Sequence, residues 1–205
     1  MIVIGSQSRG PGKESLLQAM FEARKQVFVD LLKWDVPVLD GRYEIDQFDN
    51  EHATYLIVAG PGGEHFGSAR LLPTSRPHIL DSLFPTLCAG EVPRSSDCFE
   101  ITRFCLGRNQ NARERLQTRN RLVSAIAQYA LENGISTYTG VAELNWLQQI
   151  LAFGWRCRPL GLLQMISGRT LGALRIDIDP ETPALLAANG IFSTAPVEQA
   201  PALAA

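Results

Sequence analysis

Charged and aromatic side chains recur through the first half of the chain at positions that a plain apolar core would not favour. Arg24 lies four residues before Phe28 within a helical pattern, so the two side chains share a face, and Trp34 follows shortly afterwards. Acids and arginines then fall in a loop-like segment and in two strand-like segments: Asp46, Asp49, Arg70, Glu100 and Arg103. Carboxylates can accept protons, guanidinium groups bind carboxylates in a bidentate manner, and aromatic faces hold cations.

Glu100 and Arg103 occupy one predicted strand, and this sets a geometric condition. In a regular strand Glu100 shares a face with Thr102 and Phe104, whereas Arg103 belongs to the opposite face. The two side chains therefore face apart unless a β-bulge intervenes. From the residues alone, Glu100 fits a cross-strand ion pair with an arginine as well as it fits a proton acceptor, since ion-pair networks resemble catalytic sites.

The net charge conceals a segregation of charge along the chain. The 205 residues carry a formal charge of −2, from 19 Lys and Arg against 21 Asp and Glu, which argues against a globally basic nucleic-acid-binding protein. Residues 101–121, however, contain six arginines and one acid, a net charge of +5. No nucleic-acid-binding motif accompanies this arginine segment, so we expect no nucleic-acid partner.

The elements that must position these residues follow from hydrophobic spacing and turn residues. Helical spacing predicts helices over 14–33, 79–84, 111–133 and 143–153, and residues 37–50 are predicted to be a loop. Runs of β-forming residues predict strands over 1–4, 53–59, 65–72, 98–106, 136–142, 155–160 and 171–178. This order predicts one α/β domain over residues 1–192, with a mixed, mostly antiparallel sheet flanked by helices, and an Ala/Pro-rich flexible tail over 193–205.

Composition excludes several classes of protein. Apolar residues make up 45% and charged residues 20%, as in ordinary globular domains, and no apolar run approaches the roughly 18 residues that span a bilayer. The first residues do not resemble a secretory signal. The cysteines Cys88, Cys98, Cys105 and Cys157 lack the spacing of a zinc site, so we expect reduced thiols, no metal centre and a cytoplasmic location.

Nine positions, in their order and spacing, resemble the acyl-homoserine-lactone synthases, which are the autoinducer synthases. The matching residues are Arg24, Phe28, Trp34, Asp46, Asp49, Arg70, Phe84, Glu100 and Arg103. The order of elements extends the resemblance to about residue 180, whereas the tail beyond Ile178 adds nothing to it. The resemblance implies a single domain similar to the GNAT N-acetyltransferases, with no bound cofactor.

The resemblance also implies a reaction. Such enzymes take an acyl chain from acyl carrier protein, or in some members from coenzyme A, transfer it to the amine of S-adenosylmethionine, and close a lactone with release of methylthioadenosine. The product, an N-acyl-L-homoserine lactone, is a quorum-sensing signal. A free α-amine has a pKa of roughly 8 and is mostly protonated at pH 7. A carboxylate must therefore accept a proton, and Glu100 is the candidate catalytic residue.

The other matched residues are then assigned to binding S-adenosylmethionine: Arg24, Phe28, Trp34, Asp46, Asp49, Arg70, Phe84 and Arg103. Aromatic faces suit its sulfonium, which favours Phe28 and Trp34. Arginines bind carboxylates in a bidentate manner. We therefore expect a network of two arginines with Asp46 and Asp49 that holds the N-terminal segment over the sheet.

Two further groups are assigned to the acyl donor. The acyl pocket is expected to include Thr139, Trp146 and Trp155, and the hydroxyl of Thr139 can donate to a 3-oxo group. Arginines at the start of a helix attract phosphate, so docking of coenzyme A or of an acidic, phosphopantetheine-bearing carrier protein is assigned to Arg108, Arg113, Arg115 and Arg119. The glycines of the usual acetyltransferase pyrophosphate loop are missing from residues 108–113.

Two alternatives remain open at this point. Another GNAT-type N-acyltransferase that uses coenzyme A would keep the fold and Glu100, but would not need Phe28, Trp34, Asp46 and Asp49. A non-catalytic protein that binds an acyl or adenosyl ligand is less favoured, because unpaired charges are costly to keep near a core.

Overall fold

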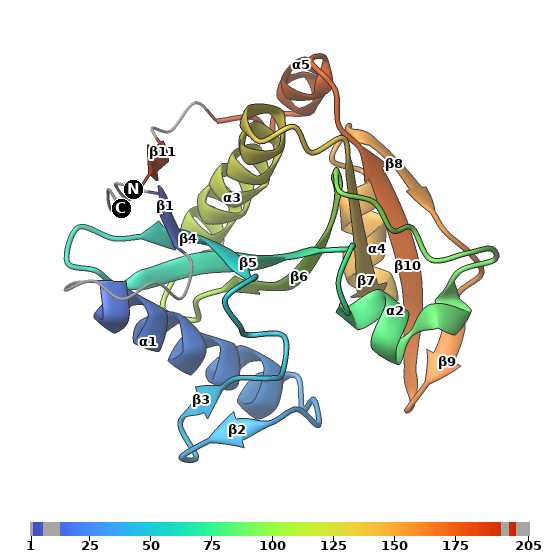
Figure 1. Cartoon of the computed structure of the whole chain (residues 1–205). Helices are drawn as coiled ribbons and strands as arrows, with labels where there is room; N and C mark the ends of the chain where they lie inside the picture. Colours follow the sequence, from blue (N-terminus) through green and yellow to red (C-terminus); the bar gives the residue numbers. More distant parts are fainter. Residues whose placement is uncertain (1, 6–12, 194–196, 200–205) are drawn as a thin grey trace. The chain divides into compact units, whose positions relative to one another are not determined.

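The computed structural model describes residues 2–5, 13–193 and 197–199 of the chain (Figure 1). The chain divides into two compact units. Unit 1 comprises residues 1–70, 103–125 and 194–205, and unit 2 comprises residues 71–102 and 126–193. Three elements pass from one unit into the other: β5 (His65–Pro73), β6 (Cys98–Leu106) and α3 (Ala112–Glu132). No helix in the described part of the chain is long and apolar enough to cross a membrane.

Unit 1 combines an N-terminal helix with the outer strands of the larger sheet. Its own elements are β1 (Ile2–Gly5), α1 (Lys13–Arg24), the π-helical segment η1 (Lys25–Leu31), β2 (Val38–Leu39), β3 (Tyr43–Glu44), β4 (Thr54–Ala59) and β11 (Val197–Gln199). The predicted helix over 14–33 thus changes from α to π at Arg24, and the predicted loop over 37–50 contains the β2–β3 hairpin. Figure 1 shows this hairpin beside the end of the helix.

Unit 2 has four strands of its own among the described residues, together with short helices and a 3₁₀ turn. Its own elements are α2 (Ile79–Leu83), the 3₁₀ turn η2 (Pro85–Leu87), β7 (Thr137–Glu143), α4 (Leu144–Leu151), β8 (Arg156–Pro159), β9 (Gln164–Ile166), β10 (Arg169–Asp177) and α5 (Thr182–Ala188). Strand β7 pairs in parallel with β6 and antiparallel with β10, which in turn pairs with β8 and β9.

Two opposite faces of β7 and β10 pack against different elements of unit 2. On one face Ala173 and Leu171 pack with Leu80 of α2 and Leu87 of η2. On the other face a Cβ at Gly172 would lie 2.8 Å from Leu147 of α4, so this face packs closely against that helix. Side chains of β7 therefore alternate between a layer under α2 and a layer under α4.

The predicted fold class is confirmed. The larger sheet has the strand order β11-β1-β4-β5-β6-β7-β10-β8, with β9 also paired to β10. Its mixed character comes from the parallel pairs β1–β11 and β6–β7 among antiparallel neighbours. Within the predicted tail, residues 197–199 form β11 beside β1, while residues 194–196 and 200–205 lie outside the described residues.

Candidate active site

Six charged side chains of unit 1 form one ion-pair network, which we call the charge network: Arg24, Arg70, Arg103, Glu44, Asp46 and Asp49. The arginines come from the end of α1 and from strands β5 and β6, whereas the acids come from β3 and the loop after it. Three positive and three negative charges balance one another. Such balance is required because an unpaired buried charge is expensive.

Arg24 and Asp49 form a deeply buried pair of the network. Arg24 donates from Nη1 and Nη2 to the two oxygens of Asp49 at 2.8 and 2.9 Å, and from Nε to Glu44 Oε2 at 2.6 Å. The Tyr55 hydroxyl donates to Asp49 Oδ1 at 2.9 Å. Burial opposes the charge of Asp49, but the hydrogen bonds and charge of Arg24 outweigh it and hold the pKa of Asp49 below its ordinary value.

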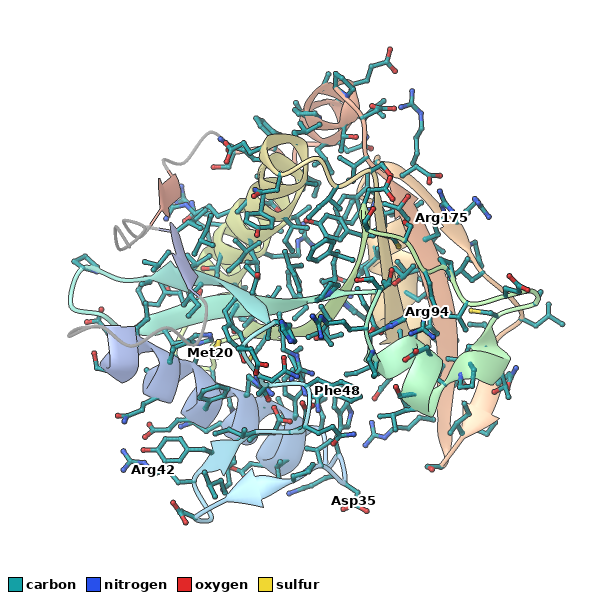
Figure 2. All side chains as sticks on the ribbon, viewed as in Figure 1. Met20, Asp35, Arg42, Phe48, Arg94 and Arg175 are labelled. Atoms are coloured by element: carbon teal, nitrogen blue, oxygen red, sulfur yellow. The ribbon has the colours of Figure 1, made fainter. Side chains whose placement is uncertain are left out.

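The other two arginines complete the network through Asp46. Arg70 donates to both oxygens of Asp46 at 2.6 and 3.0 Å, and its Nη1 lies 2.8 Å from Asp49 Oδ1. Arg103 donates to Glu44 Oε1 at 2.9 Å and to Asp46 Oδ2 at 2.7 Å. The Arg70 guanidinium also lies 5.9 Å from the ring centre of Phe48, which is labelled in Figure 2.

The backbone of Arg103 has the left-handed conformation that non-glycine residues avoid. Its φ is +49°, which costs roughly 1–2 kcal/mol. Buried and less buried residues alternate along β6 as far as Thr102, and the alternation resumes out of phase at Cys105. A left-handed residue at such a phase change is typical of a β-bulge. Because of the bulge, the side chains of Glu100 and Arg103 need not point to opposite faces of the sheet, as they would in a regular strand.

Phe28 and Trp34 stack on one another next to the charge network. Their ring centres lie 4.7 Å apart with an angle of 18° between the planes. The π-helical segment η1 brings them together, because the Trp34 amide donates to the Phe28 carbonyl at 2.8 Å. The guanidinium of Arg103 lies 5.7 Å from the Phe28 ring and 6.0 Å from the Trp34 ring. The aromatic pair therefore already presents its faces to a cation.

Glu100 lies in unit 2, where its carboxylate binds backbone amides. Ile79 N–H donates to Oε2 at 2.7 Å and Leu80 N–H donates to Oε1 at 3.0 Å. These are the first amides of α2, and the side chain of Glu100 is fully buried. Amide donors at the start of a helix favour an acceptor group, so the two hydrogen bonds fix the orientation of the Glu100 side chain.

Thr139 lies beside Glu100. The two residues are register partners across β6 and β7, and Thr139 is fully buried. Arg175 of β10, labelled in Figure 2, is the register partner of Thr139 on its other side. Thr139 thus belongs to the face under α2.

The predicted acyl-pocket residues do not form one group. Trp146 lies on α4 and contacts Phe153, which also contacts Trp155, with ring centres 5.8 Å apart in each pair. Since α4 covers the Gly172 face, Trp146 lies on the opposite side of the strands from Thr139. Phe84 packs instead against the cluster of Leu80 and Leu87 under α2.

The arginine segment divides into exposed and anchored residues. Arg108 and Arg113 are exposed at the start of α3, where Asn111 and Glu114 cap the helix through reciprocal hydrogen bonds of 2.9 and 3.0 Å. Arg115, in contrast, donates to the Gly107 carbonyl at 2.9 Å. Arg119 is half-buried and donates to the Asn120 side chain, and burial lowers its pKa. Arg115 therefore ties the first turn of α3 to the segment before it, whereas Arg119 bonds its neighbour within the helix.

Sequence reasoning missed two members of the site, Glu44 of the charge network and Tyr55, which binds to it. Charge balance could have revealed Glu44, because three matched arginines with two matched aspartates leave one positive charge unpaired. Glu44 is the next acid in the same short segment. No comparable signal marks Tyr55, which reaches Asp49 only through the fold.

Comparisons with known proteins first establish the class. The chain superposes on an N-acetyltransferase of Lactobacillus plantarum, described as putative, with a TM-score of 0.57 and 14% identity, over 87% of this chain and 98% of that one. The fold is thus that of the N-acyltransferases. A solved CoA-dependent acyl-homoserine lactone synthase, in complex with SAM and isopentyl-CoA, superposes with a TM-score of 0.84 and 28% identity, covering 99% and 95% of the two chains.

The family follows from the sequence comparisons. The autoinducer synthase family model matches residues 11–185. The acyl-homoserine-lactone synthase of Ralstonia nicotianae is 35% identical over 183 residues, which are 86% of this chain and 89% of that protein. The chain therefore belongs to the autoinducer synthase family, and it is an acyltransferase of the acyl-homoserine-lactone synthase type. This membership decides against the two alternatives that the sequence left open.

Proposed function

We propose that the enzyme transfers an acyl group from a thioester to the amine of S-adenosylmethionine and closes the product to an N-acyl-L-homoserine lactone. The observation that carries the proposal is the buried carboxylate of Glu100, held by two amides beside the buried hydroxyl of Thr139. A solved relative holds SAM and an acyl-CoA together, which supports both substrate classes.

Glu100 acts as the general base, directly or through a water molecule. It accepts a proton from the amine, whose nitrogen then attacks the thioester carbonyl and displaces the thiol, which leaves with a proton. A carboxylate offers about four acceptor positions, so binding two amides is compatible with this task. The methionyl carboxylate then attacks its own γ-carbon, and the bond to the sulfonium breaks to release neutral methylthioadenosine.

The charge network and the aromatic pair serve the S-adenosylmethionine side. The Arg103 side chain is 10% exposed, whereas those of Arg24 and Arg70 are 1% and 0% exposed. We therefore assign Arg103 to the substrate carboxylate and Phe28 and Trp34 to the sulfonium. The two buried arginines, with Asp46 and Asp49, hold Arg103 in position. Phe84 is also assigned to S-adenosylmethionine, on the basis of the family resemblance alone.

The exposed arginines Arg108 and Arg113 bind the phosphate of the donor, whether coenzyme A or the phosphopantetheine of a carrier protein. The acyl chain contacts Thr139. Trp146 and Trp155 are also assigned to the acyl chain, although they lie farther from Glu100 than Thr139 does. We also propose a cytoplasmic location, which the four free cysteines support.

The reaction is tested by following methylthioadenosine with purified enzyme. We expect release only when S-adenosylmethionine and an acyl thioester are both present, and the better donor in a panel of acyl-CoA and acyl-carrier-protein thioesters identifies the donor class. No release with any thioester in the panel would overturn the proposed function.

A further inference from the structure

The start of helix α2 carries four backbone amides that the helix itself cannot pair, and the structure gives each of them a partner. The amides of Ile79 and Leu80 donate to the two oxygens of Glu100 at 2.7 and 3.0 Å. The amide of His78, which precedes the helix, donates to the Asp81 carboxylate at 2.8 Å, and the Asp81 amide donates to the His78 side chain. This reciprocal arrangement is a capping box, and it leaves the two middle amides for Glu100.

The carboxylate of Asp81 is held by further donors. The Ser82 hydroxyl donates to Oδ1 at 2.7 Å, and Arg94 Nη1 lies 3.2 Å from Oδ2. The Asp81 side chain is only 14% exposed, and hydrogen bonds to a charged acceptor are stronger than those between neutral groups. Helix α2 has five residues and is too short to be stable by itself. The position of its first turn therefore depends on Asp81.

Arg94, labelled in Figure 2, connects this cap to the strand that carries Glu100. Its Nε donates to the Thr74 carbonyl at 3.3 Å. The Thr74 amide and hydroxyl both donate to the Cys98 carbonyl, at 3.0 and 2.9 Å. Cys98 lies two residues before Glu100 in β6. The helix start and the strand are thus joined twice, at the Glu100 carboxylate and through this chain of hydrogen bonds.

We propose that Asp81 is a positioning residue for the catalytic base: it fixes the start of α2 and thereby aims the Glu100 carboxylate at the amine of S-adenosylmethionine. Asp81 acts only through the amides of α2, and Arg94 supports it by holding its carboxylate. The inference rests on the proposed function, in which Glu100 accepts the proton of the amine. Because a base must lie within hydrogen-bond reach of the proton it accepts, a small displacement of Glu100 slows the reaction without weakening substrate binding.

Two substitutions at Asp81 isolate the hydrogen bond to the helix start. Asp81→Ala removes the acceptor of the His78 amide and introduces a good helix former. Asp81→Asn removes the charge but keeps an acceptor oxygen. Asp179→Ala is the matched control, because Asp179 also pairs with an arginine and accepts an amide, that of Glu181 at 2.9 Å, at the start of the short helix α5. None of the described contacts of Asp179 involves α2 or Glu100.

The experiment measures methylthioadenosine release at neutral pH, with an acyl-CoA or acyl-carrier-protein thioester that the wild type turns over. Asp81→Ala should lower kcat about tenfold, while the KM values for S-adenosylmethionine and the thioester stay within about threefold. Asp81→Asn should recover most of the lost kcat. Asp179→Ala should keep kcat within about twofold of the wild type, because its cap does not reach the base.

Combination with Glu100→Gln gives the sharper comparison. If Asp81 acts through Glu100, adding Asp81→Ala to Glu100→Gln should lower kcat by less than about twofold, since no base is left to position. A purely structural role would lower kcat by the same factor in both backgrounds. Thermal unfolding shows whether Asp81→Ala folds. If it does not, Arg94→Gln carries the same comparison at a side chain that is 50% exposed, with an expected loss of about threefold that disappears in the Glu100→Gln background.

Four results would overturn the inference. They are an unchanged kcat in Asp81→Ala, no recovery in Asp81→Asn, an equal loss of kcat in Asp179→Ala, and equal losses in the two backgrounds. If Asp81→Ala does not fold, an unchanged kcat in Arg94→Gln, or an equal loss in both backgrounds, overturns it. Wild-type turnover in Glu100→Gln would instead contradict the role of Glu100 as the base, and no release with any thioester would contradict the proposed function itself.

Discussion

Arg24 and Asp49 form a buried bidentate ion pair, in which Nη1 and Nη2 donate to the two carboxylate oxygens at 2.8 and 2.9 Å. The pair joins the last residue of α1 to the loop after β3. Because Glu44 and Asp46 link it onward to Arg103, the position of a proposed substrate-binding arginine depends on contacts that are largely buried. The charge network therefore holds Arg103 in position, and the desolvation penalty of its buried charges is offset because each charge is paired.

Removing one arginine from the charge network should strongly destabilise the fold. Arg24→Met removes one partner and leaves Glu44 and Asp49 with fewer counter-charges, which should lower the free energy of unfolding by about 3–5 kcal/mol. Urea denaturation measures the loss. Arg42→Met is the control, because Arg42 is 65% exposed in its pair with Glu22 and should cost under about 1 kcal/mol. Equal effects of the two substitutions would contradict the account.

Acid should weaken the same pair. The charge and hydrogen bonds of Arg24 hold the pKa of Asp49 below its ordinary value of 3.8. A carboxyl with a lowered pKa stabilises the fold fully above its ordinary pKa, and this stabilisation is lost as the pH falls through the folded pKa. Stability should therefore fall below about pH 4. Asp49→Asn should be less stable at pH 7 yet lose less stability between pH 6 and pH 2 in denaturation series, and a parallel loss in both proteins would argue against this role.

The aromatic pair should act on S-adenosylmethionine alone. Trp34→Leu removes one ring that faces a cation, an interaction worth about 0.5–2 kcal/mol. The KM for S-adenosylmethionine should rise roughly fivefold to tenfold, while the KM for the acyl thioester stays within about twofold. Initial rates with each substrate varied in turn test this. An equal rise in both KM values would indicate a packing defect instead.

Arg108 and Arg113 should act on the donor. Reversing both charges, as Arg108→Glu with Arg113→Glu, should raise the KM for a phosphate-bearing thioester about tenfold or more, and the effect should shrink at high salt. Arg42→Glu, at a residue that is 65% exposed, serves as a control for charge reversal elsewhere on the surface, and each single variant, Arg108→Glu or Arg113→Glu, matches it in net charge. An unaltered donor KM in the double variant would show that these arginines do not bind the donor.

Elements with strong local signals were predictable from the sequence. Strand β6 was predicted with its observed limits, Cys98–Leu106, and α3 to within one residue at each end, because Asn111 and Gly134 mark its caps. The β2–β3 hairpin was missed because two-residue strands leave no periodicity. Hydrophobic spacing does not distinguish a seven-residue π-helical segment from an α-helix, so it predicted one continuous helix through Arg24.

The site was partly predictable for similar reasons. The pairing of arginines with Asp46 and Asp49 follows from charge types, and charge balance would have added Glu44. The partners of Glu100 did not follow, because they are backbone amides of Ile79 and Leu80 within a connection rich in proline. Any residue except proline can supply an amide donor, so no sequence pattern marks it. The residues alone suggested a cross-strand arginine, and they gave no sign of the two amides at the start of α2 that bind Glu100.

The role of Glu100 is tested most directly by the rate of methylthioadenosine release in Glu100→Gln, measured between pH 6 and pH 9 beside the wild type. Gln keeps one oxygen for an α2 amide but cannot accept the proton of the amine. We predict a fall in kcat of about 10²-fold or more with little change in the KM for S-adenosylmethionine. Because a higher pH deprotonates the amine without help, the deficit should narrow toward pH 9. Wild-type turnover in Glu100→Gln at neutral pH would contradict the assignment of Glu100 as the base.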